Sequence, residues 1–207
     1  MMKILSHRGY WIAPSEKNSI TAFIRSFHLN FGTETDLRDH NGEIVISHDM
    51  PRNPPLLFKD FLKILGEKPL TLALNIKADG LAQKLKQIMY ENSNVNWFIF
   101  DMSIPDMKSY LDLDMPTFTR LSDVEQTPIW LEHSCGVWLD SFYNDWYDLE
   151  TINKLLVAGK QVCIVSPELH NRDYSLVWNM LYSLKESSGL MLCTDFPEKA
   201  QSFFFGS

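Results

Sequence analysis

Five side chains suited to phosphate and metal chemistry occur near the start of the chain: His7, Arg8, Glu34, Asp36 and His48. Glu34 and Asp36 are two positions apart in a segment with the pattern of a strand, so both side chains leave the same face. Carboxylate oxygens are the ligands that hard divalent cations prefer. The spacing therefore predicts a metal site with histidines close to it.

A tight turn is expected to return the chain to these carboxylates. Residues 39–42, Asp-His-Asn-Gly, have the composition of a hairpin turn, and residues 43–47 have the pattern of the returning strand. With the turn near Asn41–Gly42, His48 lies across from residues 33–36. The hairpin therefore carries a second histidine toward the predicted metal site.

A strand expected at residues 70–76 adds an amide and an ammonium group. Its large aliphatic residues alternate with a small and polar set that includes Asn75 and, just beyond the strand, Lys77. In a barrel, such a set points into the interior. We therefore expect Asn75 and Lys77 to face the site.

Strand-like and helix-like stretches alternate along the chain in the manner of repeated βα units. Eight such strands are expected, at Lys3–Ser6, Gly32–Leu37, Leu70–Ile76, Trp97–Phe100, Thr117–Arg120, Gly136–Leu139, Gln161–Val165 and Leu190–Cys193. Helices are expected at Ile20–Asn30, Phe58–Leu65, Leu81–Glu91, Ile104–Leu111, Leu149–Ala158 and Tyr174–Lys185. Pro128 leaves little room for a helix after the fifth strand. This order predicts an α/β fold in a single domain over residues 1–207.

The ordered motifs resemble the signature of the glycerophosphodiester phosphodiesterase family, which runs His-Arg-Gly, then Glu-x-Asp, then His-Asp on the following strand. Here they are His7-Arg-Gly, Glu34-Thr-Asp36 and His48-Asp49. Two weaker matches follow the family's Asn-Thr-x-x-Ala-Phe and its closing Thr-Asp-x-Pro. In this chain they are Asn18-Ser-Ile-Thr-Ala-Phe23 and Thr194-Asp-Phe-Pro197.

The resemblance implies a TIM barrel of the (β/α)8 type, for which 207 residues are near the lower limit. It also implies metal-dependent hydrolysis of a glycerophosphodiester-like phosphodiester, with Mg²⁺ or Ca²⁺ as the cofactor. The residues that match the family's two catalytic histidines are His7 and His48. Those that match its metal-binding carboxylates are Glu34 and Asp36.

The third metal ligand departs from the family's pattern. The family has Glu-x-Lys on the third strand, with the glutamate as a ligand and the lysine near the phosphate, whereas this chain has Asn75 and Lys77. An amide oxygen can still ligate a hard cation, but it brings no charge. Glu168 is the first candidate for a compensating carboxylate. Weaker candidates at or just beyond strand ends are Asp101, Asp140 and Asp195.

Cleavage of a phosphodiester requires positive charge and proton transfer. A cation, helped by Arg8 and Lys77, would stabilise the charge that builds up in the transition state. One histidine would take a proton from the attacking group and the other would give one to the departing alkoxide, with the two roles left unassigned. Attack by a hydroxyl of the substrate itself would make the enzyme a phospholipase-like lyase that releases a cyclic phosphate.

A noncatalytic protein is the alternative from a different class. With the third carboxylate missing, the chain would be a barrel that binds a phosphate-bearing ligand without turnover. The carboxylate pair would then belong to a buried ion network with Arg8, Arg38 or Lys77. Asn18 is expected to cap the helix that begins at Ile20, and Asp49 to bond local backbone.

A second departure concerns the substrate. In many family members a sizeable insertion follows the His-Asp element and shapes the glycerol side of the pocket. In this chain the next expected helix follows His48-Asp49 within about ten residues. The identity of the alcohol therefore stays open.

Charge and composition limit the partners that we expect. The formal net charge is -7 and no basic block is present, which argues against a nucleic-acid-coating role while leaving a small phosphodiester substrate compatible. The three cysteines are far apart and form no paired motif, so reduced thiols are expected. No apolar run is long enough to be a transmembrane segment, and no signal-peptide pattern is present, so the expected location is cytoplasmic. The oligomeric state is left open.

Overall fold

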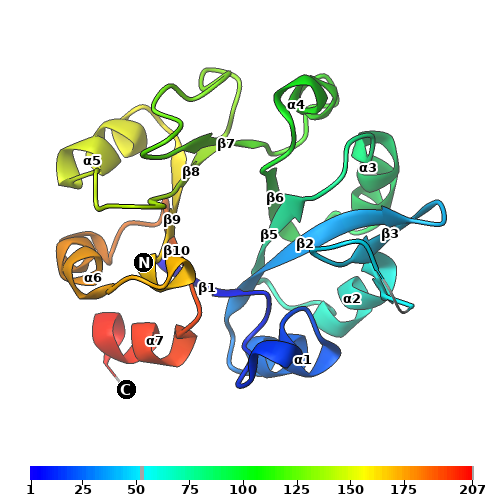
Figure 1. The fold of residues 1–207 in the computed structure, drawn as a ribbon, viewed down its shortest axis with the longest axis horizontal. Helices are drawn as coiled ribbons and strands as arrows, with labels where there is room; N and C mark the ends of the chain where they lie inside the picture. The colour runs from blue at the N-terminus through cyan, green and yellow to red at the C-terminus, as the bar shows by residue number, and fades with distance from the viewer. Residues whose placement is uncertain (52–53, 207) are drawn as a thin grey trace. The chain divides into compact units, whose positions relative to one another are not determined.

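The structure is a computed structural model that describes residues 1–51 and 54–206, and it contains both β-strands and helices (Figure 1). The chain divides into two compact units. The N-terminal unit comprises residues 6–117, and the C-terminal unit comprises residues 1–5 and 118–207. Strand β1 (Lys3–His7) crosses the boundary between them. The single domain over residues 1–207 remains a prediction.

The N-terminal unit contains a set of parallel strands with a hairpin on one side. Strand β2 (Gly32–His40) pairs in parallel with β5 (Thr71–Ile76), and β5 pairs in parallel with β6 (Asn96–Phe100). On its other edge, β2 pairs antiparallel with β3 (Glu43–Ile46), which continues to the two-residue strand β4 (Leu56–Leu57). The helical elements of this unit are the 3-10 turn η1 (Pro14–Glu16), α1 (Ile20–His28), α2 (Phe58–Leu65), α3 (Ala82–Tyr90) and α4 (Ile104–Leu111).

The hairpin register is the one that the sequence predicts. Leu37 pairs with Ile46, and His40 pairs with Glu43, so the connection consists of Asn41 and Gly42. Both have positive φ angles, 49° and 77°, as a two-residue hairpin turn requires. The turn chemistry therefore fixes the register of β3 against β2.

Aromatic packing holds the helices of the N-terminal unit against its strands. Phe23 and Phe27 of α1 contact Phe61 of α2 with ring centroids 4.6 and 5.8 Å apart, and all three side chains are buried. They belong to a core cluster that also includes buried residues of β5 such as Leu72 and Leu74. The outward-facing residues of β5 thus anchor the helices, while the alternate residues remain available for the site.

The C-terminal unit has four consecutive parallel strands: β7 (Phe118–Leu121), β8 (Gly136–Leu139), β9 (Gln161–Val165) and β10 (Leu190–Thr194). Strand β10 is the neighbour of β1. The helical elements are α5 (Leu149–Val157), η2 (Pro167–His170), α6 (Ser175–Leu181), η3 (Tyr182–Leu184) and α7 (Pro197–Phe205). None of the helices in the described residues is long and apolar enough to span a bilayer.

The eight predicted strands are confirmed with boundary changes of a few residues, and β3 is the predicted returning strand of the hairpin. The predicted helices α2 and α4 have the expected bounds. The segment between β7 and β8 contains no helix, as Pro128 led us to expect. The mixed α/β class is therefore confirmed.

Candidate active site

Glu34 and Asp36 lie together on one face of β2 and are fully buried, with 1% and 0% of their surfaces exposed. Two residues at the end of β1 and just after it, His7 and Arg8, contact Glu34. The backbone N–H of Arg8 donates to the carbonyl oxygen of Glu34 (2.9 Å) and lies 3.2 Å from Glu34 Oε2. His7 Nε2 is 3.9 Å from the same carboxylate oxygen. The first predicted histidine is thus a neighbour of the first predicted metal ligand.

Gly9 allows the backbone to turn after His7 and Arg8. Its φ angle is +79°, and a Cβ atom added there would lie only 2.8 Å from the Cβ of Ala22 in α1. Its N–H donates to Thr33 Oγ1 (2.9 Å). Only glycine combines this φ angle with so close an approach to the helix, which explains why glycine follows the histidine and the arginine.

Asp36 is surrounded by positive and polar groups. Arg8 Nε lies 3.0 Å from Asp36 Oδ2, Asn18 Nδ2 donates to the same oxygen (2.8 Å), and Lys77 Nζ lies 3.7 Å from Asp36 Oδ1. Asn18 also accepts a hydrogen bond from Thr35 Oγ1 (2.9 Å). The carboxylate is therefore held in place from three sides.

The prediction that Asn18 caps α1 is wrong. Ser19 is the N-cap, and its side chain accepts a hydrogen bond from the N–H of Ala22 (3.3 Å). Asn18 instead has a left-handed backbone (φ 59°) and turns its amide toward Asp36. Because serine is itself a strong N-cap residue, its presence next to Asn18 was the signal that the asparagine was free for another role.

Asn75 completes a group of three oxygen-bearing side chains. It pairs with Asp36 across the β2–β5 ladder, and its side chain hydrogen-bonds Glu34. Within the described residues, Asp36 Oδ1 and Asn75 Oδ1 are buried and have no hydrogen-bond partner. Buried acceptors without a partner are rare and point to a missing ligand or ion.

The environment of Glu34 disfavours its charged form. Burial and, secondarily, the charge of Asp36 raise the pKa of Glu34 to about 8, against the opposing effects of Arg8, Lys77 and Asn75. A cation at this position would favour the carboxylate and displace its proton. Two carboxyl groups and one amide oxygen are hard donors of the kind that hold Mg²⁺ or Ca²⁺, so the residues present fit a divalent cation.

Asn75, the third possible ligand, is a neutral amide, so this site differs from one built of charged ligands alone. In the part of the chain that the structure describes, no three His, Cys, Asp or Glu side chains are grouped to hold a metal ion. The group here has two carboxyl side chains and an amide. Their roles as ligands remain predictions.

His48 follows the hairpin and is more exposed than His7, with 44% of its side-chain surface accessible against 13%. The N–H of Ser47 donates to the carbonyl oxygen of Asp36 (3.1 Å), which brings His48 to the end of the paired region. His48 Nδ1 lies 2.8 Å from Asp49 Oδ1. The pKa of Asp49 is lowered chiefly by its hydrogen bond to His48.

The prediction that Asp49 bonds local backbone does not describe its side chain, which contacts His48. The carbonyl oxygen of Asp49 does accept a hydrogen bond from Ser47 Oγ (2.7 Å), but its carboxylate bonds the ring of His48. This carboxylate is highly exposed, at 92%. Its contact orients the imidazole from the solvent side.

Lys77 contacts Asp101, which the sequence indicated as a weaker candidate for the compensating carboxylate. Its Nζ lies 3.3 Å from Asp101 Oδ2, in addition to its contact with Asp36. Arg38 Nη2 donates to the carbonyl oxygen of Lys77 (2.6 Å). Asp101 has a left-handed backbone with φ 70°, an uncommon conformation for a residue with a side chain.

The other candidate carboxylates belong to the C-terminal unit and have partners there. Glu168 accepts hydrogen bonds from the hydroxyls of Ser166 and Thr194 and from the N–H of Asp195 (3.1 Å). Burial is the main cause that raises the pKa of Glu168. Asp140 accepts a hydrogen bond from the N–H of Ser141 and lies 2.7 Å from His170 Nε2.

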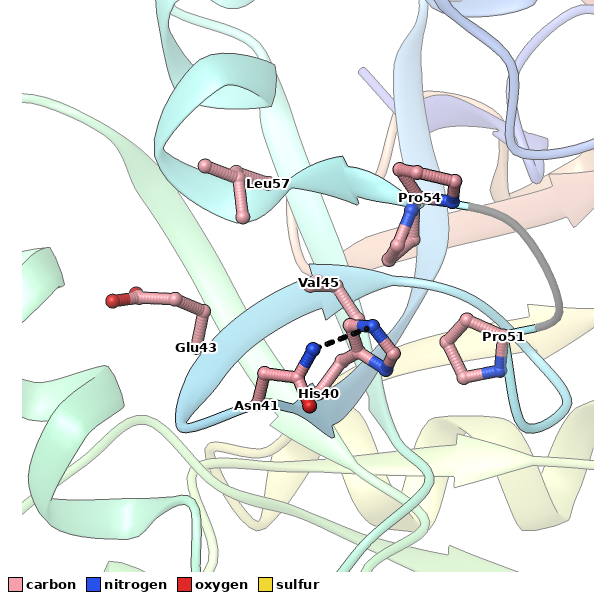
Figure 2. A pocket seen from close by; sticks show the side chains of 8 residues that line it. His40, Asn41, Glu43, Val45, Pro51, Pro54 and Leu57 are labelled. Carbon is pink, nitrogen blue, oxygen red and sulfur yellow. Dashed lines mark hydrogen bonds between the residues drawn. The ribbon is translucent and has the colours of Figure 1, made fainter.

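A separate cavity of about 520 Å³ borders the hairpin of the N-terminal unit (Figure 2). Its wall combines polar side chains near the turn with prolines and aliphatic side chains: His40, Asn41, Glu43, Val45, Pro51, Pro54, Pro55 and Leu57. In Figure 2 the amide of Asn41 faces the ring of His40, with Nδ2 and Nε2 3.2 Å apart. None of the predicted catalytic or metal-binding side chains is among the residues that line it.

Comparisons with known proteins identify related folds. No protein-family model matches the sequence, and no curated protein matches it. The structure is similar to a glycerophosphodiester phosphodiesterase from Agrobacterium tumefaciens, with a TM-score of 0.68, 16% identity, and coverage of 98% of this chain and 99% of that one. It is also similar to a glycerophosphoryl diester phosphodiesterase from Parabacteroides distasonis, with a TM-score of 0.52, 13% identity, and coverage of 98% and 86%. The mixed α/β fold of this chain is therefore similar to the folds of these two solved structures, while the complete (β/α)8 barrel remains a prediction.

Proposed function

We propose that this protein is a metal-dependent phosphodiesterase with a (β/α)8 barrel fold that hydrolyses a small, glycerophosphodiester-like substrate. The observation that carries the proposal is that, in the described part of the chain, buried polar atoms without a hydrogen bond gather around the carboxylate pair, where Arg8 Nε and Asp36 Oδ1 have only ion contacts. Of the six buried side-chain polar atoms that lack a hydrogen bond among the described residues, four belong to this site: Arg8 Nε, Asp36 Oδ1, Arg38 Nε and Asn75 Oδ1. A phosphate and a cation would supply partners of both charges.

The cation would be held by Glu34, Asp36 and Asn75. Bound there, a divalent cation supplies positive charge that stabilises the developing negative charge on the phosphate oxygens. Arg8 and Lys77 add two positive side chains close to the same carboxylates. These two side chains would bind and orient the nonbridging oxygens of the phosphate.

His48 is the better candidate for the general base. The carboxylate of Asp49 favours a proton on Nδ1, so Nε2 keeps the lone pair that can take a proton from an attacking water. The water oxygen forms a bond to phosphorus while the bond to the alcohol oxygen breaks. In this proposal His7, whose Nε2 lies 3.9 Å from Glu34, carries the proton that it gives to the departing alkoxide.

Assays on a panel of phosphodiesters test the proposal. Glycerophosphocholine, glycerophosphoethanolamine and bis-p-nitrophenyl phosphate would be incubated with Mg²⁺, Ca²⁺ or Mn²⁺, or with a chelator. We expect turnover of at least one glycerophosphodiester that the chelator abolishes and that added metal restores. ³¹P NMR of the products separates hydrolysis, which gives a phosphomonoester, from a lyase reaction, which gives a cyclic phosphate.

A phosphate-binding protein without turnover is the second candidate, and a specific observation favours it. Asp36 already has two cationic partners, Arg8 and Lys77, and Asn75 adds no charge to attract a metal ion. Saturable binding of inorganic phosphate or of a glycerophosphodiester, with no product under any metal condition, would replace the enzymatic proposal with this one.

A further inference from the structure

Lys77 lies between two carboxylates, only one of which belongs to the proposed metal ligands. Its ammonium donates a hydrogen bond to Asp101 Oδ2 at 3.3 Å and lies 3.7 Å from Asp36 Oδ1. The side chains of Lys77 and Asp101 are 18% and 17% exposed, and that of Asp36 is fully buried. The ammonium is thus closer to the carboxylate outside the ligand group.

The strand register explains this contact. Asn75 of β5 pairs with Phe100 of β6 in parallel. Lys77 is the first residue after β5 and Asp101 the first after β6, so both leave the carboxyl ends of neighbouring strands. The backbone of Asp101 has φ 70°, in the left-handed region, which aspartate adopts more often than most residues with a side chain.

A cation at Asp36 would conflict with the ammonium of Lys77. Asp36 Oδ1 is the oxygen that lacks a hydrogen bond, and it is also the oxygen nearest to Lys77 Nζ. Like charges repel strongly at this separation in a buried site. The ammonium therefore needs another carboxylate to pair with, and Asp101 is the one that it already contacts.

We infer that Asp101 is a positioning residue that keeps the Lys77 ammonium away from Asp36, so that a divalent cation can bind there while Lys77 stays beside the phosphate. The inference rests on the proposed function, since it requires a cation at Asp36. It differs from the view that Asp101 replaces the missing third carboxylate as a ligand. The absence of a three-member His, Cys, Asp or Glu metal group within residues 1–51 and 54–206 argues against that view.

The test is a double-mutant cycle on metal affinity, measured by calorimetric titration with Mg²⁺, Ca²⁺ and Mn²⁺. The proteins are the parent, Asp101→Asn, Lys77→Met and the double variant. Asparagine removes the charge of Asp101 and tolerates the left-handed backbone as well as aspartate does. For a pair in contact, we expect Asp101→Asn to weaken cation binding by about tenfold when Lys77 is present.

The Lys77→Met background distinguishes positioning from ligation. We expect Lys77→Met alone to tighten binding, because it removes the repelling ammonium, and we expect Asp101→Asn to have less than about a twofold effect in that background. An undiminished loss of affinity in the Lys77→Met background would show that Asp101 binds the cation directly and would overturn the inference. No loss in either background would overturn it as well.

Asp114→Asn is the matched control, because Asp114 is exposed, also has a positive φ angle (51°), and would undergo the same change of charge. We expect it to leave cation affinity unchanged. Melting temperatures of all variants show whether Asp101→Asn acts only by destabilising the fold. In that case Asp101→Asn would lower the melting temperature equally with and without Lys77, which would contradict the inference. If the parent binds no divalent cation, the proposed function fails first and this inference fails with it.

Discussion

Glu34 and Asp36 of the N-terminal unit are buried within β2, whereas Glu168 of the C-terminal unit is half-buried in η2, and their hydrogen bonding also differs. Glu168 receives donors on both oxygens from Ser166, Thr194 and the backbone of Asp195. Asp36 has one oxygen in contact with Arg8 and Asn18, while its other oxygen lacks a hydrogen bond among the described residues. A carboxylate whose bonds are complete stabilises its loops, whereas one with an open acceptor can take a ligand.

This difference predicts that changes near Glu34 and Asp36 affect binding and turnover, whereas changes near Glu168 affect stability. The two regions also differ in how they can be tested. Variants of the first are best followed by kinetics and cation titration, and variants of the second by denaturant unfolding.

The largest expected effect is on turnover. His7→Ala and His48→Ala should each lower kcat by about 10²- to 10⁴-fold, because positioned proton transfer typically contributes that much. The measurement is kcat on the best substrate of the panel, at saturating metal. The matched control is His170→Ala, whose partner is Asp140 in the C-terminal unit and which should keep kcat near the parent's value. Near-native rates for both His7→Ala and His48→Ala would contradict the assignment.

The second effect is a pH dependence of the free energy of unfolding, measured with a chelator present so that no metal ion is bound. Because the pKa of Glu34 is raised from 4.5 to about 8, the folded state holds a proton that the unfolded state has lost between these values. The free energy of unfolding should therefore fall as the pH rises from 4.5 to 8, with a slope of at most about 1.4 kcal/mol per pH unit for one proton. Urea unfolding of the parent and of Glu34→Gln measures it.

Glu34→Gln should flatten that pH dependence, because the amide does not titrate. Glu168→Gln provides the comparison for the other region, where the pKa of the carboxyl is also raised by burial but the oxygens have donors. An equal slope in the parent and in Glu34→Gln would show that Glu34 is not the group responsible.

The third effect is a loss of stability in the C-terminal unit. Glu168→Ala leaves the hydroxyl of Thr194 and the N–H of Asp195 without their acceptor. Unsatisfied buried donors cost about 1–3 kcal/mol, so the free energy of unfolding should fall by about that amount. Urea unfolding tests this, and cation affinity measured on the same variant should not change. Weakened cation binding would instead make Glu168 a ligand.

The smallest effect is a gain of cation affinity. Asn75→Glu adds a carboxylate beside Glu34 and Asp36, and added ligand charge strengthens binding of hard cations. We expect binding to tighten by about tenfold, which corresponds to roughly 1.4 kcal/mol. Asn75→Gln is the matched control for side-chain length, since it keeps an amide. Unchanged or weaker binding in Asn75→Glu would mean that Asn75 does not face a cation.

The sequence by itself determined the features that depend on neighbouring residues. The Asn41–Gly42 turn fixed the hairpin register because both residues accept positive φ angles, and the two-residue spacing of Glu34 and Asp36 fixed their common face. Helix α2 begins and ends where the sequence predicts, since its apolar positions recur with helical spacing and Gly66 follows. The ordered motifs also led to the family whose solved structures are similar in fold to this chain.

Tertiary structure decided which side chains meet across strands. Asn18 could cap a helix or reach Asp36, and only the packing of α1 beside β2 selects Asp36, while Ser19 takes the cap. Asp101 and Lys77 are 24 residues apart, and their contact follows from the register of β5 against β6. The pKa of Glu34 likewise results from burial, which no local pattern encodes. Hydrogen bonds and charges at such a site depend on distances set by the whole unit, so residue types and spacing alone leave them open.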